Sequence, residues 1–158
     1  MSTTFWKAIS VLAICVLVML QSQAQSKRKK RMIQRVVSEA QSYLGAPYQY
    51  GGMSRAGIDC SGLMYKCYQS IDVKLPRTAK AQSKTGRKKN WDNVREGDIV
   101  FFKFRKKGEK WFHSGIITYA HRGEIRFIHS STSRGVIESD LNAEYYRDNV
   151  KRFRRVIR

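Results

Sequence analysis

The spacing of hydrophobic residues predicts helices in the first half of the chain. Apolar side chains recur every three or four positions over residues 32–44, as in an amphipathic helix, and a glycine and a proline then end the pattern. A second helix is predicted to begin at Cys60, with Asp59 as its N-cap. The segment that follows is polar and basic, and only one short helix is expected in it, near residues 78–83.

The second half of the chain has the pattern of β-strands. Strands are predicted at residues 98–104, 113–120 and 124–130, with weaker candidates at 136–138 and 153–157. Helices followed by an antiparallel sheet make an α+β fold. A chain of 158 residues has room for one domain, which buries enough surface to fold without disulfides.

Residues 1–24 are expected to be a signal peptide. Lys7 lies in a short basic region and is followed by an apolar run of about 13 residues, whereas about 20 are needed to span a bilayer. Small residues at Ser22 and Ala24 suit signal-peptidase cleavage. An uncleaved anchor is the alternative, but it would leave the basic segment 25–32 outside the membrane, against the positive-inside bias.

A lipoprotein attached through Cys15 is a further alternative. It is disfavoured because Ile14 stands where a small residue should precede the cysteine. We therefore expect export to the periplasm or cell envelope, with residues 33–158 as the folded domain.

The charge of the chain is unusually high. It has 31 Lys and Arg residues against 12 Asp and Glu, for a formal net charge of +19. A field of this sign attracts anionic polymers and lipid head groups. Nucleic acid is the usual partner of so basic a chain, but export favours anionic envelope polymers, and no nucleic-acid partner is expected.

Two cysteines remain if residues 1–24 are removed. Cys60 and Cys67 are seven residues apart, which on one helix places them about 10 Å apart and beyond the reach of a disulfide. Cys67 lies among apolar residues and is interpreted as core packing. Cys60 lies in the first turn of its helix, where the helix dipole is expected to lower the thiol pKa and produce a nucleophile.

The base for this thiol is sought among three histidines. His113 begins one predicted strand and His129 ends the next, while His121 lies beside a turn and is interpreted as solvated. With a two-residue turn at Arg122 and Gly123, the two strand histidines would face opposite sides of the sheet. A three-residue loop at 121–123 places them on one face, and we predict this form.

On one face, the two histidines can act together. His113 then takes the thiol proton and later protonates the leaving amine. His129 hydrogen-bonds the other nitrogen of the His113 ring and fixes the tautomer of His113. The backbone N–H of Cys60 and the hydroxyl of Tyr50 are candidates to stabilise the oxyanion. A neutral polar residue such as His129 suffices to fix the tautomer of His113 because the Cys–His pair can already be charged at rest.

These residues lie in motifs that resemble one family, the NlpC-type cysteine peptidases of bacterial cell walls, which are reduced relatives of papain. The motifs occur in order over nearly all of residues 33–157: Gly45-Ala46-Pro47-Tyr48-Gln49-Tyr50-Gly51-Gly52, Asp59-Cys60-Ser61-Gly62-Leu63, Leu75-Pro76-Arg77-Thr78, Glu96-Gly97-Asp98-Ile99-Val100-Phe101-Phe102, His113-Ser114-Gly115-Ile116 and Phe127-Ile128-His129-Ser130. The resemblance implies a minimal papain-like fold, with the Cys-bearing helix packed on an antiparallel sheet.

The resemblance also implies an activity and its residues. The implied enzyme is an endopeptidase that hydrolyses peptidoglycan stem peptides, at D-γ-glutamyl to diamino acid bonds or at cross-links. Cys60, His113 and His129 match the family's triad. Tyr50 matches the tyrosine beside the active site, and Asp59 and Ser61 match positions that help to bind substrate.

Two other kinds of function are considered. The fold could be kept as an inactive module that binds wall fragments or a partner, which the intact triad argues against. Alternatively, the three triad residues could hold zinc, but the sequence lacks the paired short spacings of structural zinc sites. No metal or cofactor is expected.

Overall fold

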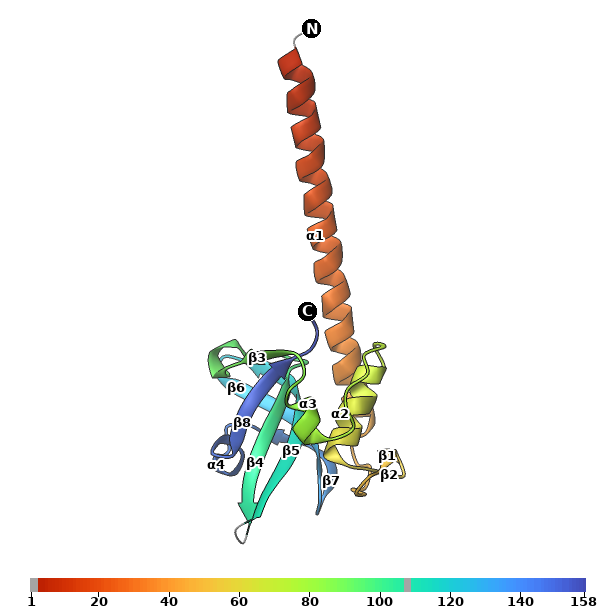
Figure 1. Ribbon diagram of the computed structural model, residues 1–158, viewed down its shortest axis with the longest axis vertical. Helices are drawn as coiled ribbons and strands as arrows, with labels where there is room; N and C mark the ends of the chain where they lie inside the picture. The colour runs from red at the N-terminus through yellow and green to blue at the C-terminus, as the bar shows by residue number, and fades with distance from the viewer. Residues whose placement is uncertain (1–2, 107–108) are drawn as a thin grey trace. The chain divides into compact units, whose positions relative to one another are not determined.

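The computed structural model describes residues 3–106 and 109–158, and the side chains of 14–104 and 112–158. Two compact units are distinguished, Met1–Met32 and Ile33–Arg158. Helix α1 (Thr3–Ser42) includes the described part of the first unit and the beginning of the second (Figure 1). In the described part of the chain, no helix has the length and apolar character needed to cross a membrane.

The predicted signal peptide falls within α1. Its first two residues and its side chains up to residue 13 lie outside the described part of the chain. Cleavage after residue 24, the basic segment 25–32 and the peptidase domain 33–158 therefore stay predictions.

An antiparallel sheet forms the frame of the second unit. Its described strands lie in the order β3–β8–β4–β5–β6–β7 (Figure 1). Their bounds are Arg87–Lys89 for β3, Ile99–Lys106 for β4, Glu109–His121 for β5, Glu124–Ser131 for β6, Gly135–Asp140 for β7 and Val150–Arg155 for β8. The five predicted strands are confirmed, whereas the short edge strand β3 was not predicted because its sequence, Arg-Lys-Lys, has no apolar residue.

The remaining elements are short and lie around the sheet. They are the strands β1 (Met53–Ser54) and β2 (Gly57–Ile58), the helices α2 (Cys60–Gln69), α3 (Ala79–Gln82) and α4 (Glu144–Arg147), and the 3-10 helix η1 (Trp91–Asn93). Helix α2 begins at Cys60 as predicted, and α3 falls within the expected short helix.

Strand β4 is buried on both faces, which explains its unbroken apolar sequence from Ile99 to Phe102. Phe102 belongs to a cluster on one face, with Phe127 and Phe153. Helix α2 contacts the sheet at β5 and β6, and its Leu63 is fully buried. The fold is the α+β arrangement predicted from the sequence.

The turn between β5 and β6 has two residues, so the predicted three-residue loop is wrong. His121 pairs with Glu124, and Arg122 and Gly123 have φ values of 51° and 84°. Positive φ at both central residues is typical of the turn whose twist matches a hairpin. This turn alone would place the strand histidines on opposite faces of the sheet.

A β-bulge at Thr118 restores the alignment that the loop was expected to provide. The register shifts between Ile117 and Tyr119, so that Ile117 pairs with Phe127 and Ile116 with Ile128. The hydroxyl of Thr118 donates to Glu138 Oε1 at 2.6 Å, which ties the bulge to β7. One extra residue in the strand therefore replaces one extra residue in the loop.

Candidate active site

Cys60 is the first residue of α2, and its position depends on Asp59. The Asp59 side chain accepts a hydrogen bond from the backbone N–H of Gly62 at 2.6 Å, which caps the helix. A second bond, from the N–H of Gly51 at 2.9 Å, joins the cap to the preceding loop. The nucleophile candidate thus lies between a helix and a loop that share one carboxylate.

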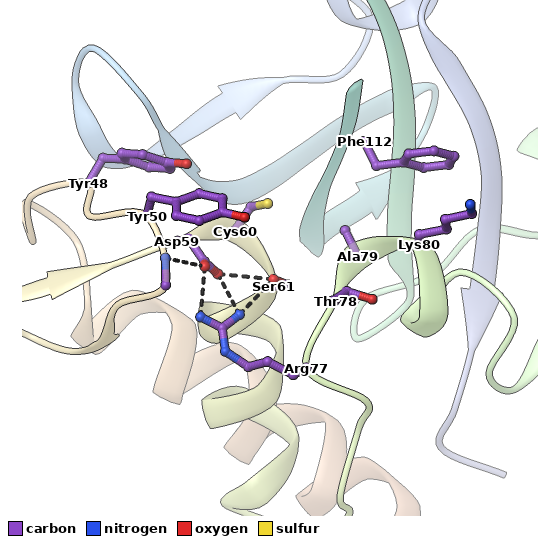
Figure 2. A pocket seen from close by; sticks show the side chains of 11 residues that line it. Tyr48, Tyr50, Asp59, Cys60, Ser61, Arg77, Thr78, Ala79, Lys80 and Phe112 are labelled. Atoms are coloured by element: carbon purple, nitrogen blue, oxygen red, sulfur yellow. Dashed lines mark hydrogen bonds and ion pairs between the residues drawn. The ribbon is translucent and has the colours of Figure 1, made fainter. Parts of the chain in front are cut away.

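Arg77 holds the same carboxylate from the other side. Its guanidinium donates to both oxygens of Asp59, at 3.0 and 2.7 Å, and to the hydroxyl of Ser61 at 2.9 Å (Figure 2). Ser61 also donates to Asp59, at 3.0 Å. Asp59 and Ser61, predicted to bind substrate, therefore form one unit with Arg77, whose role the sequence did not reveal.

The charge state of Asp59 follows from this network. Burial favours the neutral acid, but hydrogen bonds from Arg77, Gly62 and Ser61 outweigh it and hold the pKa of Asp59 below its usual range. The site therefore contains a carboxylate next to the thiol.

The Cys60 thiol is less acidic than its place in the helix suggested. Burial raises its pKa and the Asp59 carboxylate raises it further, while the nearby polar groups of Ser114 and the Ser61 backbone N–H lower it. The expected fall in pKa from the helix dipole is wrong for this geometry, because burial dominates. The Ser114 hydroxyl is fully buried and, within the described chain, makes no hydrogen bond of regular geometry.

His113 immediately precedes Ser114 in β5 and contacts His129. The Nε2 atom of His113 lies 2.8 Å from Nδ1 of His129, and the rings are nearly perpendicular, at 88°. The Nε2 atom of His129 lies 3.0 Å from the hydroxyl of Ser139 and 3.2 Å from that of Tyr146. The structure thus brings both predicted histidines to one face, and links them to two hydroxyls that the sequence analysis missed.

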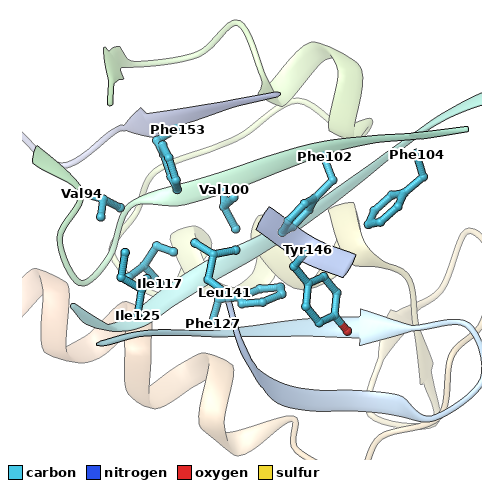
Figure 3. Close-up of a cluster of buried hydrophobic side chains, with 10 residues drawn as sticks. All are labelled: Val94, Val100, Phe102, Phe104, Ile117, Ile125, Phe127, Leu141, Tyr146 and Phe153. Atoms are coloured by element: carbon cyan, nitrogen blue, oxygen red, sulfur yellow. The ribbon is translucent and has the colours of Figure 1, made fainter. Parts of the chain in front are cut away.

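The aromatic core holds these rings in place. The His129 ring stacks on Phe127 with centroids 4.7 Å apart, and Tyr146 contacts both rings. Figure 3 shows Phe127 and Tyr146 within the buried cluster, close to Phe102. His113 lies 5.9 Å from Phe102, centroid to centroid. Packing therefore restricts both imidazoles to a narrow range of orientations.

Burial also keeps both histidines neutral. It lowers the pKa of His113 to about 3, with a further contribution from His129. It lowers the pKa of His129 to about 4, helped by the positive charge of Arg134. Both histidines and the thiol thus favour their uncharged forms, so the charged Cys–His pair that the sequence allows is not the form favoured by this geometry.

A cavity of about 420 Å³ opens beside Cys60 and is lined by Tyr48, Tyr50, Asp59 and Arg77 (Figure 2). Tyr50 is 89% exposed. Tyr48 is partly buried, and its pKa is raised by burial and then by the negative charges of Cys60 and Asp59.

Tyr48 is a further cavity residue that the sequence analysis did not single out. Its backbone bridges Ile58, two residues before the nucleophile candidate. This pairing is not local in sequence. The only sequence signal for Tyr48 is that the motif Tyr48-Gln49-Tyr50 offers two tyrosines, either of which could face the cavity.

The sequence allows a zinc site at the three triad residues as an alternative. Within the described residues, no group of three or more His, Cys, Asp or Glu side chains is arranged to hold a metal ion.

Comparison with known proteins identifies the family. Residues 45–155 match the family model described as NlpC/P60. The chain belongs to the NlpC/P60 family. It is 40% identical over 119 residues to a probable endopeptidase NlpC of Escherichia coli, a match that covers 75% of this chain and 74% of that protein.

Other NlpC/P60 relatives are longer than this chain. It is 33% identical over 124 residues to the murein DD-endopeptidase MepS/murein LD-carboxypeptidase of Escherichia coli, covering 78% of this chain and 62% of that protein. An NlpC/P60 family protein from Bacillus cereus has a similar structure, with a TM-score of 0.69 and 29% identity, covering 80% of this chain and 40% of that one. The family, the fold and the cysteine-peptidase class expected from the sequence are confirmed.

Proposed function

We propose that this chain is a peptidoglycan endopeptidase that cuts stem peptides with Cys60 as nucleophile, His113 as base and His129 as the residue that orients it. The observation that carries the proposal is an arrangement on strand β5. There, His113 Nε2 lies 2.8 Å from His129 Nδ1, and the adjacent Ser114 lies close enough to Cys60 to lower the pKa of its thiol.

The reaction starts from neutral partners. His113 Nδ1 takes the thiol proton as Cys60 sulfur attacks the peptide carbonyl, so that a C–S bond forms. His113 then gives this proton to the leaving nitrogen as the C–N bond breaks. Water, activated by the same ring, hydrolyses the thioester and restores the thiol.

The hydrogen-bond chain supports this direction of proton transfer. His113 must present an unprotonated Nδ1, so its Nε2–H donates to Nδ1 of His129. His129 then carries its proton on Nε2, where the hydroxyls of Ser139 and Tyr146 lie at 3.0 and 3.2 Å. His129 therefore selects the tautomer that the reaction needs.

Stabilisation of the oxyanion is proposed for the backbone N–H of Cys60 and a tyrosine hydroxyl. Tyr48 suits this role because it is partly buried in the cavity, whereas the exposed Tyr50 suits contact with the substrate further out. Asp59 and Ser61 are proposed to bind substrate as part of the unit with Arg77.

The bond that is cut is proposed to be either a D-γ-glutamyl to diamino acid bond or a cross-link. The names of relatives include both kinds: a gamma-DL-glutamyl hydrolase of Bacillus subtilis, 32% identical over 145 residues, and the murein DD-endopeptidase above. This chain covers 34% of the former protein.

Digestion of defined muropeptides, followed by mass spectrometry of the fragments, tests the activity and identifies the bond. We expect cleavage by the wild type, loss of cleavage in Cys60→Ala, and unchanged cleavage in His121→Gln, which alters an exposed histidine at the turn between β5 and β6. Wild-type protein that binds muropeptides without cutting any of them would instead support an inactive binding module.

The place of action is proposed to be the periplasm or cell envelope, reached by export with residues 1–24 as signal. Anionic envelope polymers are proposed to bind the sheet edge formed by β3 and β8. Arg87 pairs with Arg155 and Lys88 with Arg154 across these strands. Only Arg155 of these four has a carboxylate partner among the described residues, Asp98 at 2.7 Å.

Like charges in direct opposition destabilise a strand pair, so this edge suits an anionic partner. Binding to isolated wall material should weaken steeply between low and high salt. It should also weaken when Arg87, Lys88 and Lys89 are replaced together by glutamine. Binding that does not respond to salt would contradict this proposal.

A further inference from the structure

A second cavity opens on the histidine side of the site. Its volume is about 370 Å³, and it is lined by both histidines, Arg134 and the tyrosines of α4. It shares no lining residue with the cavity beside Cys60. The proposed reaction therefore has two separate spaces for the two halves of a substrate.

The chemistry decides which half enters which space. The carbonyl carbon must reach the Cys60 sulfur, which lines the first cavity. The leaving nitrogen must reach His113, which lines the second, because His113 supplies its proton. The amine half of the substrate therefore extends towards Arg134.

Arg134 supplies an uncompensated positive charge there. Its side chain is exposed, and within the described residues it makes no hydrogen bond or ion pair. The other lining residues are hydroxyl-bearing or aromatic, with no carboxylate among them. Arg134 acts on the site itself, since its charge contributes to the low pKa of His129.

The turn that carries Arg134 is held firmly by its neighbours. Gly135 has a φ of 70°, and a Cβ there would lie 2.4 Å from the carbonyl oxygen of Ala46. The N–H of Val136 donates to the same oxygen at 2.8 Å, and its own carbonyl accepts from Gly45 at 2.9 Å. The backbone next to Arg134 is therefore fixed against the loop after α1.

We propose that Arg134 is a specificity-determining residue that binds a carboxylate on the amine half of the substrate. The preferred substrate then releases an amine whose own residue bears a free carboxylate, and the guanidinium pairs with it in a bidentate manner. This inference rests on the proposed function, because the roles of Cys60 and His113 define which half lies beside Arg134.

The test uses two matched peptide substrates that differ only on the amine side, one with a free carboxylate and one with the carboxamide. We expect the wild type to have a kcat/KM at least about tenfold higher for the carboxylate, mainly through KM. Arg134→Gln should reduce this ratio to near one, and Arg134→Lys should keep part of it. The matched control is Arg122→Gln, which removes the same charge at the other end of β6 and should keep the wild-type ratio.

A binding measurement separates failure of this inference from failure of the proposed function. The two corresponding amine products are titrated into Cys60→Ala and into Cys60→Ala/Arg134→Gln, with dissociation constants measured by calorimetry. Tighter binding of the carboxylate product that depends on Arg134 supports the subsite, even if no substrate is cleaved. Equal binding of both products to Cys60→Ala, or an equal loss of both substrates in Arg134→Gln, would overturn it.

Discussion

His113 Nε2 lies 2.8 Å from His129 Nδ1 because of a bulge towards the end of β5. The turn that joins their strands would otherwise turn the two rings to opposite faces of the sheet. The extra residue, Thr118, corrects the register between the turn and the site. The proposed catalytic pair thus depends on a strand irregularity several residues away from either histidine.

Replacement of His129 should reduce turnover strongly without unfolding the domain. His129→Ala removes the acceptor of the His113 Nε2–H, so the tautomer and orientation of His113 are lost, and we expect kcat to fall about 10²-fold or more. His129→Gln retains an acceptor and should lose less. Ser139→Ala, which removes only the 3.0 Å contact to the far nitrogen of His129, serves as control and should lose less than about tenfold.

Alkylation of Cys60 should be slow at neutral pH. Burial and Asp59 raise the thiol pKa, so the rate with iodoacetamide should keep rising above pH 8.5, the ordinary pKa of cysteine. The measurement uses a Cys15→Ser background, because Cys15 is exposed and Cys67 is buried. Asp59→Asn should speed the reaction at pH 7. A rate that is already fast and level from pH 6 upwards would instead indicate an ion pair at rest.

The domain should lose stability as the pH falls from 6.5 towards 4. His113 and His129 have folded-state pKa values of about 3 and about 4, below the unfolded value near 6.5, so the unfolded chain binds more protons in this window. The free energy of unfolding should decrease by on the order of 2 kcal/mol per histidine between pH 7 and 5. Urea titrations measure this slope, and the slope should be smaller in His113→Gln/His129→Gln. An unchanged slope in that variant would show that other groups cause the loss.

Arg77→Met should destabilise the domain by about 2 kcal/mol at pH 7, because it leaves the Asp59 carboxylate buried without its ion-pair partner. The loss should shrink progressively as the pH falls below the ordinary pKa of an aspartate, about 3.9, because the unfolded chain is then protonated and the lowered folded pKa of Asp59 contributes less and less stability. Urea unfolding at both pH values measures the difference.

The control for Arg77 is Arg126→Met. Arg126 forms an ion pair of the same length, 2.7 Å, with Glu124, but both side chains are about half exposed. Its loss should cost much less than the loss of Arg77, because exposed ion pairs contribute little stability. Equal effects of the two substitutions would mean that Asp59 does not depend on Arg77.

Much of the fold follows from local patterns. The start of α2 at Cys60 was predictable because Asp59 satisfies free N–H groups of the helix from within three residues. The strands that carry the histidines were predictable because their apolar spacing reflects burial on the sheet. Strand β3 was not, because its charged side chains give no such pattern and it forms only by pairing with β8.

The site likewise contains residues that local sequence indicates and residues that only folding brings together. Its candidate nucleophile and histidines were predicted from their local contexts and motifs. The contacts of Arg77 with Asp59 and the position of Tyr48 come from residues brought together by folding. The sign of the thiol pKa shift was predicted wrongly because a helix start is visible in the sequence, whereas the density of packing around the sulfur is not.

The sequence by itself therefore determined the family and the order of the elements, and it named the candidate reacting residues, since these depend on short-range spacing and motif chemistry. Only the tertiary structure decided how His113 and His129 meet. A two-residue turn and a distant bulge combine to give the same register as the predicted three-residue loop. The register of two strands depends on the turn and on every bulge between the turn and the site, so no local segment of the sequence can specify it.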